Sequence, residues 1–365
     1  MNNSSVQPTK ILNQDPSCSD AVTTLFTVLL SIVTLAAFIG NFVVIVSFIK
    51  TTSLKTSTNY YIVNMAVSDL FCACFNWPLF AAEGMLTSRQ FISDHLASVV
   101  CKLGMYFRGI SQVVSVLSLV LISVDRYVAI VFPLKIIVLD RRGVRLAFLT
   151  LTWIIPIVCG FPYVIYTEVV KVDDKTFCRT VWSRLLRVVF NFIGFVVFYC
   201  APIFVMTILY ARVIKTVRNR PNTADKTQDQ MNSKRQKQHQ KITKILISIV
   251  AAFFVCWTPL CIYLSLKMFH PDLIAKDKCL VFVALFFYLF PSFSTAINPV
   301  ILFLFSSNYR QALTNMSLQV YYFFNKKFRV LGHANRRVGS SHGLDNVVLT
   351  AYIRGETAST ICVKS

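Results

Sequence analysis

The stretch VVCKLGMYFRGISQVVSVLSLVLISVDRYVAIV, residues 99–131, decides the fold. It is apolar enough to lie in a bilayer, yet Cys101, Arg108 and Ser115 recur every seven residues and share one helix face. From Cys101 to Arg126 a helix would be roughly 37 Å long, whereas a hydrocarbon core is about 30 Å thick. Ionisable groups on a spanning helix usually face a bundle interior. We therefore predict a tilted transmembrane helix that lines the inside of a helical bundle.

The composition also indicates a membrane protein. Of 365 residues, 55% are hydrophobic and only 15% are charged, which is unusual for a soluble protein. The formal net charge of +21 could indicate nucleic-acid binding, but Lys and Arg lie between the apolar segments, as membrane topology requires. We therefore expect no nucleic-acid partner. No cleavable signal peptide is evident, because the first 20 residues are polar and the first apolar run is too long.

Seven apolar segments, each long enough to cross a bilayer, predict an all-α seven-transmembrane bundle over residues 22–304. The predicted spans are 22–49, 59–83, 99–131, 144–166, 187–213, 242–266 and 279–304. Alternate connections hold more than twice as many Lys and Arg as the others, which places those connections and the C-terminus in the cytoplasm.

The polar segments between and beyond the spans complete the predicted organisation. Residues 1–21 form an extracellular segment, and the basic, Gln-rich stretch 218–240 is expected to be a flexible loop. An amphipathic helix on the cytoplasmic membrane surface is expected at 307–328, followed by a disordered cytoplasmic tail at 329–365. Asn2 and Asn3 begin overlapping N-glycosylation sequons, consistent with an outer N-terminus.

Short motifs follow one another along these spans. They are Gly40-Asn41-Phe42-Val43-Val44, Asn64-Met65-Ala66-Val67-Ser68-Asp69-Leu70, Cys101, Asp125-Arg126-Tyr127, Trp153, Pro202, Tyr210, Phe253, Cys256-Trp257-Thr258-Pro259 and Asn298-Pro299. In this order they resemble the rhodopsin-like (class A) G-protein-coupled receptors, from Phe38 to Phe328, and the chain is closest in character to the peptide-receptor branch. The resemblance implies a plasma-membrane receptor, not an enzyme and without a cofactor, that activates heterotrimeric G proteins. Arrestins, receptor kinases and membrane lipids are the further partners it implies.

The resemblance also assigns residues to the switch and to G-protein coupling. They are Asp125, Arg126, Tyr127, Tyr210, Phe253, Trp257, Pro259, Asn298 and Pro299. In the family, Asp125 holds Arg126 at rest, and on activation Arg126 contacts Tyr210 and the G protein. Many members have a second acidic partner for this arginine where the chain has His239, so we expect raised resting activity. Most members have Tyr at Leu302, which leaves that part of the activation mechanism open.

Two prolines interrupt the predicted fifth and sixth spans. Pro202 and Pro259 each remove a backbone hydrogen bond and kink the helix, either as a static bend or as a hinge. Trp257 precedes Pro259 by two residues and can transmit pressure from a ligand to the kink. The resemblance implies that the cytoplasmic half of the sixth helix then moves outward.

Asp69 places a carboxylate in the middle of an apolar span. It is either a protonated, hydrogen-bonded core residue or the centre of a cation site. The expected sodium-site residues are Asp69, Ser115, Asn298, Ser294 and Thr295. In the family the matching positions bind a sodium ion that favours the inactive state, although Ser294 stands where many members have Asn. Sodium is the only metal that we expect, as an allosteric ligand.

The cysteines divide between spans and outer segments. The resemblance implies a disulfide between Cys101 and Cys178, and a second between Cys18 and Cys279 as in the chemokine branch; two free outer thiols are the alternative to the second. Within the spans, free buried thiols are expected at Cys72, Cys74, Cys159, Cys200, Cys256 and Cys261.

Arg108 narrows the class of ligand. It occupies the position where amine receptors carry an Asp, and the seventh span has no Lys for a retinal Schiff base, with Ser292 at the matching site. Arg108 could bind a carboxylate with two hydrogen bonds, or form an internal salt bridge with Glu83. The expected ligand-binding residues are Arg108, Glu83, Gln112, Arg187 and Trp257.

These observations favour a receptor for a peptide with an acidic group. A small carboxylic or lipid acid is the alternative ligand. A seven-helix transporter or membrane enzyme is less favoured, because only Asp69, Glu83 and Arg108 lie well inside the spans and no His lies within one.

Overall fold

The computed structural model describes residues 20–82, 94–133, 141–172, 175–219, 226–269 and 289–334. The elements are α1 (Asp20–Lys50), η1 (Thr52–Leu54), α2 (Ser57–Ala82), α3 (Asp94–Val131), α5 (Arg142–Tyr166), β1 (Thr167–Val172), β2 (Lys175–Thr180), α6 (Arg184–Phe195), η2 (Val196–Cys200), α7 (Ala201–Arg218), α8 (Lys226–Phe269), α11 (Phe290–Phe305) and α12 (Ser307–Ala334). Contacts divide the chain into two units, Met1–Leu313 and Thr314–Ser365, and α12 runs from the first into the second.

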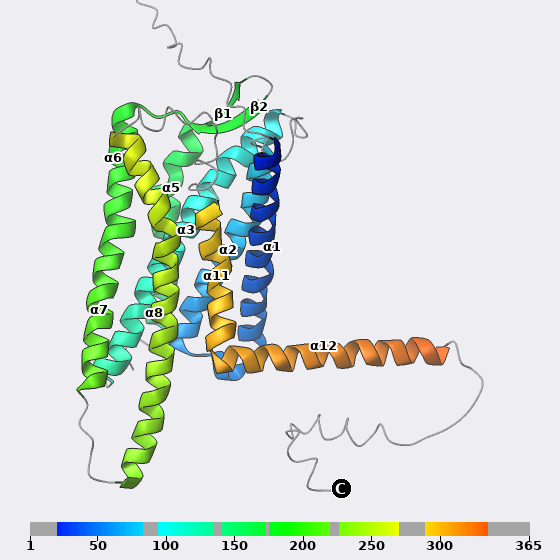
Figure 1. Ribbon diagram of the computed structural model, residues 1–365, viewed down its shortest axis with the longest axis vertical. Coiled ribbons are helices and arrows are strands. Elements are labelled where there is room, and N and C mark those ends of the chain that lie inside the picture. Colours follow the sequence, from blue (N-terminus) through cyan, green and yellow to red (C-terminus); the bar gives the residue numbers. More distant parts are fainter. Residues whose placement is uncertain are drawn as a thin grey trace, which may run out of the picture. The chain divides into compact units, whose positions relative to one another are not determined.

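Helix α3 is the centre of the bundle. It packs against α2, α5, α7 and α8, and it also contacts strand β1. Helix α1 packs against α2 and α11, and α11 packs against α8. In Figure 1 α3 crosses the bundle obliquely, as expected for a helix longer than the bilayer core. Its polar row is buried, because Cys101, Arg108 and Ser115 all face the neighbouring helices.

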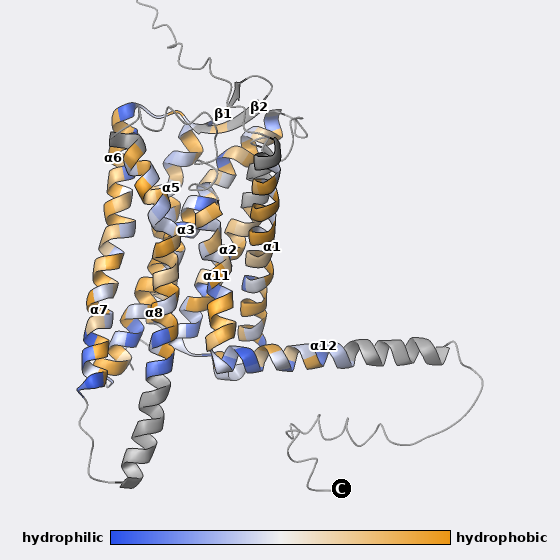
Figure 2. Ribbon diagram, viewed as in Figure 1, coloured by the Kyte–Doolittle hydropathy of each residue, from blue (hydrophilic) through white to orange (hydrophobic). Residues whose placement is uncertain are grey.

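Apolar side chains cover the outside of the bundle as well as its core. Phe204, Val255 and Val158 are among many large apolar residues that are exposed at the protein surface, a pattern that fits a lipid environment rather than water. Figure 2 shows apolar residues along the middle of the helices and hydrophilic residues gathered near their ends.

Helices of transmembrane length account for most of the described chain. Among the described residues, five helices are long and apolar enough to cross a membrane: Thr24–Lys50, His95–Val131, Arg142–Tyr166, Arg184–Arg218 and Gln240–Leu266. Phe290–Phe305 meets the same criterion only together with Ser307–Gln319, across a bend. In chain order, α1, α2, α3, α5, α6–α7, α8 and α11 correspond to the seven predicted spans.

A short π-helical segment joins α6 and α7 into one span. The N–H of Ala201 donates to the carbonyl of Val196, five residues back, immediately before Pro202. Proline has no N–H to donate, so the ladder is already interrupted here. Such π segments are rare inside α-helices and re-aim the side chains beside them. Tyr199 belongs to this segment, and its hydroxyl lies 2.6 Å from that of Thr258 on α8.

Three sequence predictions are wrong at the level of boundaries or burial. Stretch 218–240 is not loop throughout, because α8 already begins at Lys226. The surface helix does not end at residue 328, because α12 continues to Ala334. The span cysteines are thiols, as expected, but only Cys72 and Cys256 are buried. Cys261 is half-buried, and Cys74, Cys159 and Cys200 are exposed. In a lipid-facing bundle an apolar neighbourhood in sequence does not show which side of a helix faces inward.

Several predicted features lie outside the described residues. They are the sequons at Asn2 and Asn3, the proposed pair Cys18 and Cys279, and Glu83. The N-terminal residues 1–19 and the tail 335–365 also lie outside them. These assignments stay predictions.

Candidate functional site

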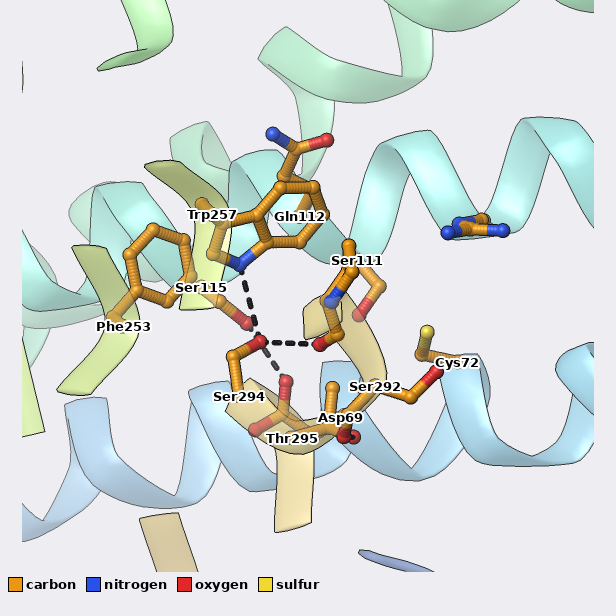
Figure 3. Close-up of a pocket in the computed structure, with 12 residues that line it drawn as sticks. Asp69, Cys72, Ser111, Gln112, Ser115, Phe253, Trp257, Ser292, Ser294 and Thr295 are labelled. Atoms are coloured by element: carbon orange, nitrogen blue, oxygen red, sulfur yellow. Dashed lines mark hydrogen bonds between the residues drawn. The ribbon is translucent and has the colours of Figure 1, made fainter. Parts of the chain in front are cut away.

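A small polar cavity lies where α2, α3, α8 and α11 meet. Its lining residues are Asp69, Cys72, Arg108, Ser111, Gln112, Ser115, Phe253, Trp257, Pro291, Ser292, Ser294 and Thr295. Its volume is about 10 Å³, near the space that one water molecule requires. Figure 3 shows side chains from these helices pointing toward this common space. The predicted ligand-binding and sodium-site residues therefore largely share one cavity.

Asp69 is the most deeply buried charged group of this cavity, with 1% of its surface exposed. Its Oδ1 accepts a hydrogen bond from the Ser115 hydroxyl at 2.9 Å, and its Oδ2 accepts one from the Asn298 amide at 3.0 Å. The Oδ1 atom of Asn298 is buried and has no hydrogen-bond partner among the described residues. A buried carboxylate requires compensation, and an orphaned amide oxygen beside it is a second acceptor.

This oxygen set fits a small hard cation. A carboxylate, an amide oxygen and hydroxyl groups are the ligand types such ions prefer, and the cavity has room for one particle of that size. Among the described residues no group of three His, Cys, Asp or Glu side chains could hold a metal.

A run of serines connects α2 and α3 beside Asp69. Ser111 donates to the carbonyl of Ser68 at 2.8 Å, and the Ser68 and Ser115 hydroxyls lie 3.0 Å apart. Sequence analysis assigned no role to Ser68 or Ser111. The spacing of Ser111, Ser115 and Ser118 by four and three residues places them on one helix face, and this signal could have identified the strip.

Trp257 connects the cavity to α11. Its indole N–H donates to the Ser294 hydroxyl at 3.1 Å, and Ser294 donates in turn to the Pro291 carbonyl at 2.7 Å. The Phe253 ring stacks near Trp257 with centroids 5.8 Å apart. Thr295 donates to the Ser292 carbonyl at 2.8 Å. The residue two positions before Pro259 therefore holds α8 to α11 directly.

The predicted ligand-binding residues divide into two groups. Arg108, Gln112 and Trp257 line the cavity, and Arg108 is buried with 9% of its surface exposed. Arg187 does not line it; its side chain is exposed and donates to the Trp182 carbonyl at 3.1 Å. The alternative partner of Arg108, Glu83, lies outside the described residues.

The opposite end of α3 carries the second candidate site. Arg126 forms an ion pair with Asp125 at 2.7 Å. Thr58 on α2 donates to the same Asp125 oxygen at 2.6 Å, a contact that sequence analysis missed. Tyr210 accepts a hydrogen bond from Ser123 at 3.2 Å. The pair that the resemblance predicts for the resting state is present and has an extra donor from α2.

The remaining switch residues lie on α3, α8 and α11 and differ in how deeply they are buried. Asn298 and Pro299 are buried in α11, and Leu302 is buried one turn further on. Pro259 interrupts α8. The Tyr127 ring is half-buried and meets the Phe132 ring edge to face, with centroids 5.8 Å apart.

A disulfide ties the N-terminal part of α3 to the hairpin that follows α5. Cys101 and Cys178 are bonded, as the resemblance predicts. The hairpin pairs β1 with β2 antiparallel, with Val169 opposite Cys178. Cys101 precedes Arg108 by about two helical turns. The bond therefore fixes the hairpin beyond the Arg108 end of the cavity.

Helix α5 is held to the bundle by a further polar cluster. The Trp153 indole N–H donates to the Asn64 side-chain oxygen at 2.8 Å. The Asn64 amide donates to Ser118 at 2.9 Å and to Thr152 at 3.0 Å. One asparagine thus connects three helices, which explains why Asn64 and Trp153 belong to the motif set.

These features define the class of the chain. Residues 40–302 match the family described as 7 transmembrane receptor (rhodopsin family). The chain belongs to this family. Its fold is the seven-transmembrane helix bundle, and it is a receptor rather than an enzyme.

Curated proteins similar to this chain are named as receptors, one of them as a receptor of tachykinin-like peptides. The chain is 27% identical over 321 residues to the tachykinin-like peptides receptor 86C of Drosophila melanogaster, covering 84% of this chain and 57% of that one. It is 28% identical over 275 residues to the neuromedin-K receptor of Rattus norvegicus, covering 74% and 58%. It is 28% identical over 250 residues to prokineticin receptor 2 of Mus musculus, and the match covers 66% of this chain and 63% of that receptor. The chain therefore spans less than two thirds of the length of these relatives.

Proposed function

We propose that the chain is a G-protein-coupled receptor for an extracellular peptide with an acidic group. The observation that carries this proposal is Arg108, a buried guanidinium in the same cavity as Trp257. A guanidinium can bind a carboxylate through two parallel hydrogen bonds, and more strongly in a desolvated site than in water. The names of the tachykinin-like peptides receptor and its fellow relatives favour a peptide over other acids.

The proposed signal passes from Arg108 to the sixth span. A ligand group at Arg108 would share the cavity with Trp257, whose contact with Ser294 holds α8 to α11. Loss of that contact would free the cytoplasmic half of α8, which precedes the Pro259 kink in the chain, to move outward. At the far end, Arg126 would leave Asp125 and contact a heterotrimeric G protein, and later arrestins and receptor kinases would bind.

Asp69 is the proposed site of an inhibitory sodium ion. Asp69, Ser115, Asn298, Ser294 and Thr295 would hold it, and the orphaned Asn298 oxygen supports this assignment. When bound, the ion would offset the buried negative charge. The hydroxyl of Ser115 and the amide of Asn298 already orient the carboxylate from two other helices. A sodium ion held at Asp69 by groups of α3 and α11 would draw both helices toward α2. Because the resting bundle is the more compact one, the ion would favour the resting state.

The proposed orientation places the Arg126 end of the bundle in the cytoplasm of a cell with the receptor in its plasma membrane. The last turn of α7 carries Lys215 and Arg218, and α5 begins with Arg142, all at this end of their helices. Basic residues accumulate on the cytoplasmic side of membrane proteins. The N-terminus is then extracellular.

The test is a peptide screen with a double-mutant cycle. Cells expressing the chain are screened for second-messenger output with peptides that carry a free carboxylate, each compared with its amidated form. We expect Arg108→Ala to cost an acidic agonist on the order of 2–5 kcal/mol, the range for truncating a buried charge partner. Amidation of the agonist should then cost little more in the Arg108→Ala receptor.

Arg184→Ala is the matched control, because Arg184 is exposed, does not line the cavity and is not among the predicted ligand-binding residues. It should leave the discrimination between acidic and amidated peptides unchanged. If the losses of agonist affinity caused by Arg108→Ala and by amidation simply add, Arg108 does not contact the carboxylate of the agonist. Activation by small carboxylic or lipid acids, with no active peptide, would favour the alternative ligand class.

A further inference from the structure

Four aromatic rings from α5, α6 and the segment between β2 and α6 form one cluster. The Trp182 ring meets Phe190 edge to face with centroids 4.6 Å apart, and its centroid lies 5.4 Å from that of Tyr163. Tyr163 meets Phe190 edge to face at 5.7 Å, and Tyr166 meets Trp182 in the same way at 6.0 Å. Most of these pairs therefore have the edge-to-face geometry that aromatic rings prefer.

Tyr163 connects the ring cluster to Arg108. A Cβ at Gly109 would lie 3.8 Å from Cε2 of Tyr163, so the ring rests in ordinary contact with the α3 backbone at the residue after Arg108. The Tyr163 phenol also lies close enough to the Arg108 guanidinium to interact with its charge. Because Arg108 lines the cavity, the cluster adjoins the proposed carboxylate site.

The indole N–H of Trp182 is the unexplained polar group of this cluster. Trp182 is 6% exposed, and its Nε1 atom is buried without a hydrogen-bond partner among the described residues. The indole N–H groups of Trp153 and Trp257 both donate to side-chain oxygens. Burying a donor without a partner is costly, and nearly all buried polar groups in native proteins are paired. An acceptor that enters with a ligand would remove this cost.

The backbone around Trp182 is fixed on both sides. The N–H of Val181 donates to the Tyr166 carbonyl at 2.7 Å, and Arg187 donates to the Trp182 carbonyl at 3.1 Å. The disulfide of Cys178 anchors the same strand to α3. The indole is therefore held in position before a ligand binds, which lowers the entropy lost on binding. In this arrangement Arg187 orients Trp182 instead of lining the cavity.

A cation, aromatic rings and a single N–H donor match one part of a peptide. A guanidinium binds a carboxylate, rings pack against an apolar or aromatic side chain, and an N–H binds a carbonyl. The C-terminal residue of a peptide presents its α-carboxylate, its side chain and the preceding carbonyl within a few bonds of one another. An Asp or Glu residue carries its acid where the ring would be, and a fatty acid has no peptide carbonyl.

We propose that Arg108, Tyr163 and Trp182 recognise the C-terminus of a peptide that ends in an aromatic residue with a free carboxylate. The carboxylate accepts hydrogen bonds from the Arg108 guanidinium and the Tyr163 hydroxyl. The terminal ring packs against Tyr163 and Phe190, which are half-buried and offer ring surface. The Trp182 N–H donates to the carbonyl of the penultimate residue. This inference rests on the proposed function, which gives the ligand an acidic group, and specifies where in the peptide that group lies.

The first test is a hexapeptide library on cells that express the full chain, with second-messenger output as the readout. Random hexapeptides end in Phe, Tyr, Trp, Leu, Asp or Lys, each as the free acid and as the amide. Free acids that end in an aromatic residue should act at concentrations about two- to ten-fold below those that end in Leu. Their amides should be about ten-fold weaker or more. Activity confined to an internal acidic residue with an amidated terminus, or to non-peptide acids, would overturn the proposal.

The second test removes single contacts of the most active free-acid hexapeptide. Trp182→Phe keeps a ring but removes the N–H, and it should weaken this peptide about two- to ten-fold. A peptide analogue with a trans-alkene in place of its last amide lacks the carbonyl. It should be weaker by the same factor on the wild type, and it should lose nothing further on Trp182→Phe. Equal potency of analogue and parent peptide on the wild type would refute the Trp182 contact without relying on any receptor variant.

Tyr163→Phe tests the contact with the carboxylate. It should weaken the free acid about ten- to 100-fold, the range for a hydrogen bond to a charged group, and leave the amide unchanged. The matched control is Tyr166→Phe, which removes a hydroxyl from an exposed ring of the same cluster and should change neither peptide.

A purely structural role of the cluster predicts a different result. Trp182→Phe and Tyr163→Phe would then weaken the free acid, the amide and the alkene analogue by equal factors, which would overturn the proposal. The proposed function is read separately, from the cycle of Arg108→Ala with amidation, which leaves Trp182 in place. Surface expression and thermal unfolding of each variant identify any that lose activity by misfolding.

Discussion

Gly40→Ala tests how closely α1 approaches α11. A Cβ at Gly40 would lie 2.9 Å from both Cβ and Cγ of Pro299, whereas carbon atoms in favourable contact are about 3.5–4.0 Å apart. The proline ring is rigid and buried in α11, so one of the two helices must shift. Overpacking of this kind costs about 1–3 kcal/mol. The gain from replacing a helical Gly with Ala is about 0.5–1 kcal/mol, so we expect a net destabilisation of about 1–2 kcal/mol.

Two other glycines serve as internal references. A Cβ at Gly194 would meet nothing within 4 Å, so Gly194→Ala should stabilise the protein by about 0.5–1 kcal/mol. A Cβ at Gly160 would lie 3.3 Å from the edge of the Tyr106 ring, which can move slightly, so Gly160→Ala should be near neutral. The expected order of stability is Gly194→Ala, Gly160→Ala, Gly40→Ala.

The assay is thermal unfolding of purified receptor whose exposed thiols, among them Cys74, Cys159 and Cys200, are first blocked with unlabelled maleimide. Unfolding is then followed with a maleimide dye that reacts as the buried Cys72 and Cys256 thiols become accessible. Each 1 kcal/mol should shift the midpoint by a few degrees. If Gly40→Ala unfolds at or above the midpoint of Gly194→Ala, α1 and α11 do not approach as closely as the structure shows. The predicted clash between a Cβ added at Gly40 and the Pro299 ring would then be wrong.

Three further predictions concern signalling. Millimolar sodium should weaken agonist binding to the wild type but not to Asp69→Asn; equal sensitivity in both would contradict the cation site. Ligand-free output should exceed that of mock cells, and His239→Glu should lower it several-fold by giving Arg126 an ion pair worth about 1 kcal/mol; a silent wild type at matched surface expression would count against this. Tyr199→Phe removes the 2.6 Å hydrogen bond to Thr258, worth about 0.5–1.5 kcal/mol, and should raise ligand-free output by up to about ten-fold; unchanged output would show that α8 moves without breaking this bond.

The position of the candidate site could be predicted from the sequence because its residues follow simple rules. A polar row at seven-residue spacing on an apolar helix is expected to face inward, so spacing alone assigns Arg108 and Ser115 to the bundle interior. Asp69 follows from the cost of a carboxylate among apolar residues. The sequence motifs indicate two separate sites, a ligand site at Arg108 and a cation site at Asp69. In the structure both residues line the same cavity.

Contacts between helices could not be predicted in the same way. Whether Thr58 reaches Asp125, or Tyr199 reaches Thr258, depends on the rotation and offset of two helices. A residue's own sequence neighbourhood does not contain that information. The π segment before Pro202 adds a residue to one turn and changes the direction of Tyr199, which no periodicity reveals.

The error at the start of α8 has a different origin. The prediction of a loop at 218–240 rests on its lack of apolar residues, which is a criterion for burial rather than for helix formation. From Lys226 onward the stretch has neither Gly nor Pro and is rich in Lys, Arg and Gln, which are good helix formers. A helix that extends beyond the membrane needs propensity but no apolar face, and α8 is such a helix.

Because the proposed ligand site and the proposed cation site share one cavity, we predict that occupation of one weakens the other. Arg108 and Ser115 are separated by about 10 Å along α3, so the carboxylate-binding end and the Asp69 end are distinct, but Trp257 and Ser294 border the same space. At about 10 Å³ the cavity is far smaller than the 300–1,000 Å³ of ordinary ligand pockets. A ligand group that enters between Arg108 and Trp257 must therefore widen it, and we expect the widening to displace Trp257 together with Ser294, which accepts its hydrogen bond. A cation held by the oxygens of Asp69 and Ser294 opposes that motion, and by linkage the ligand weakens the cation to the same extent.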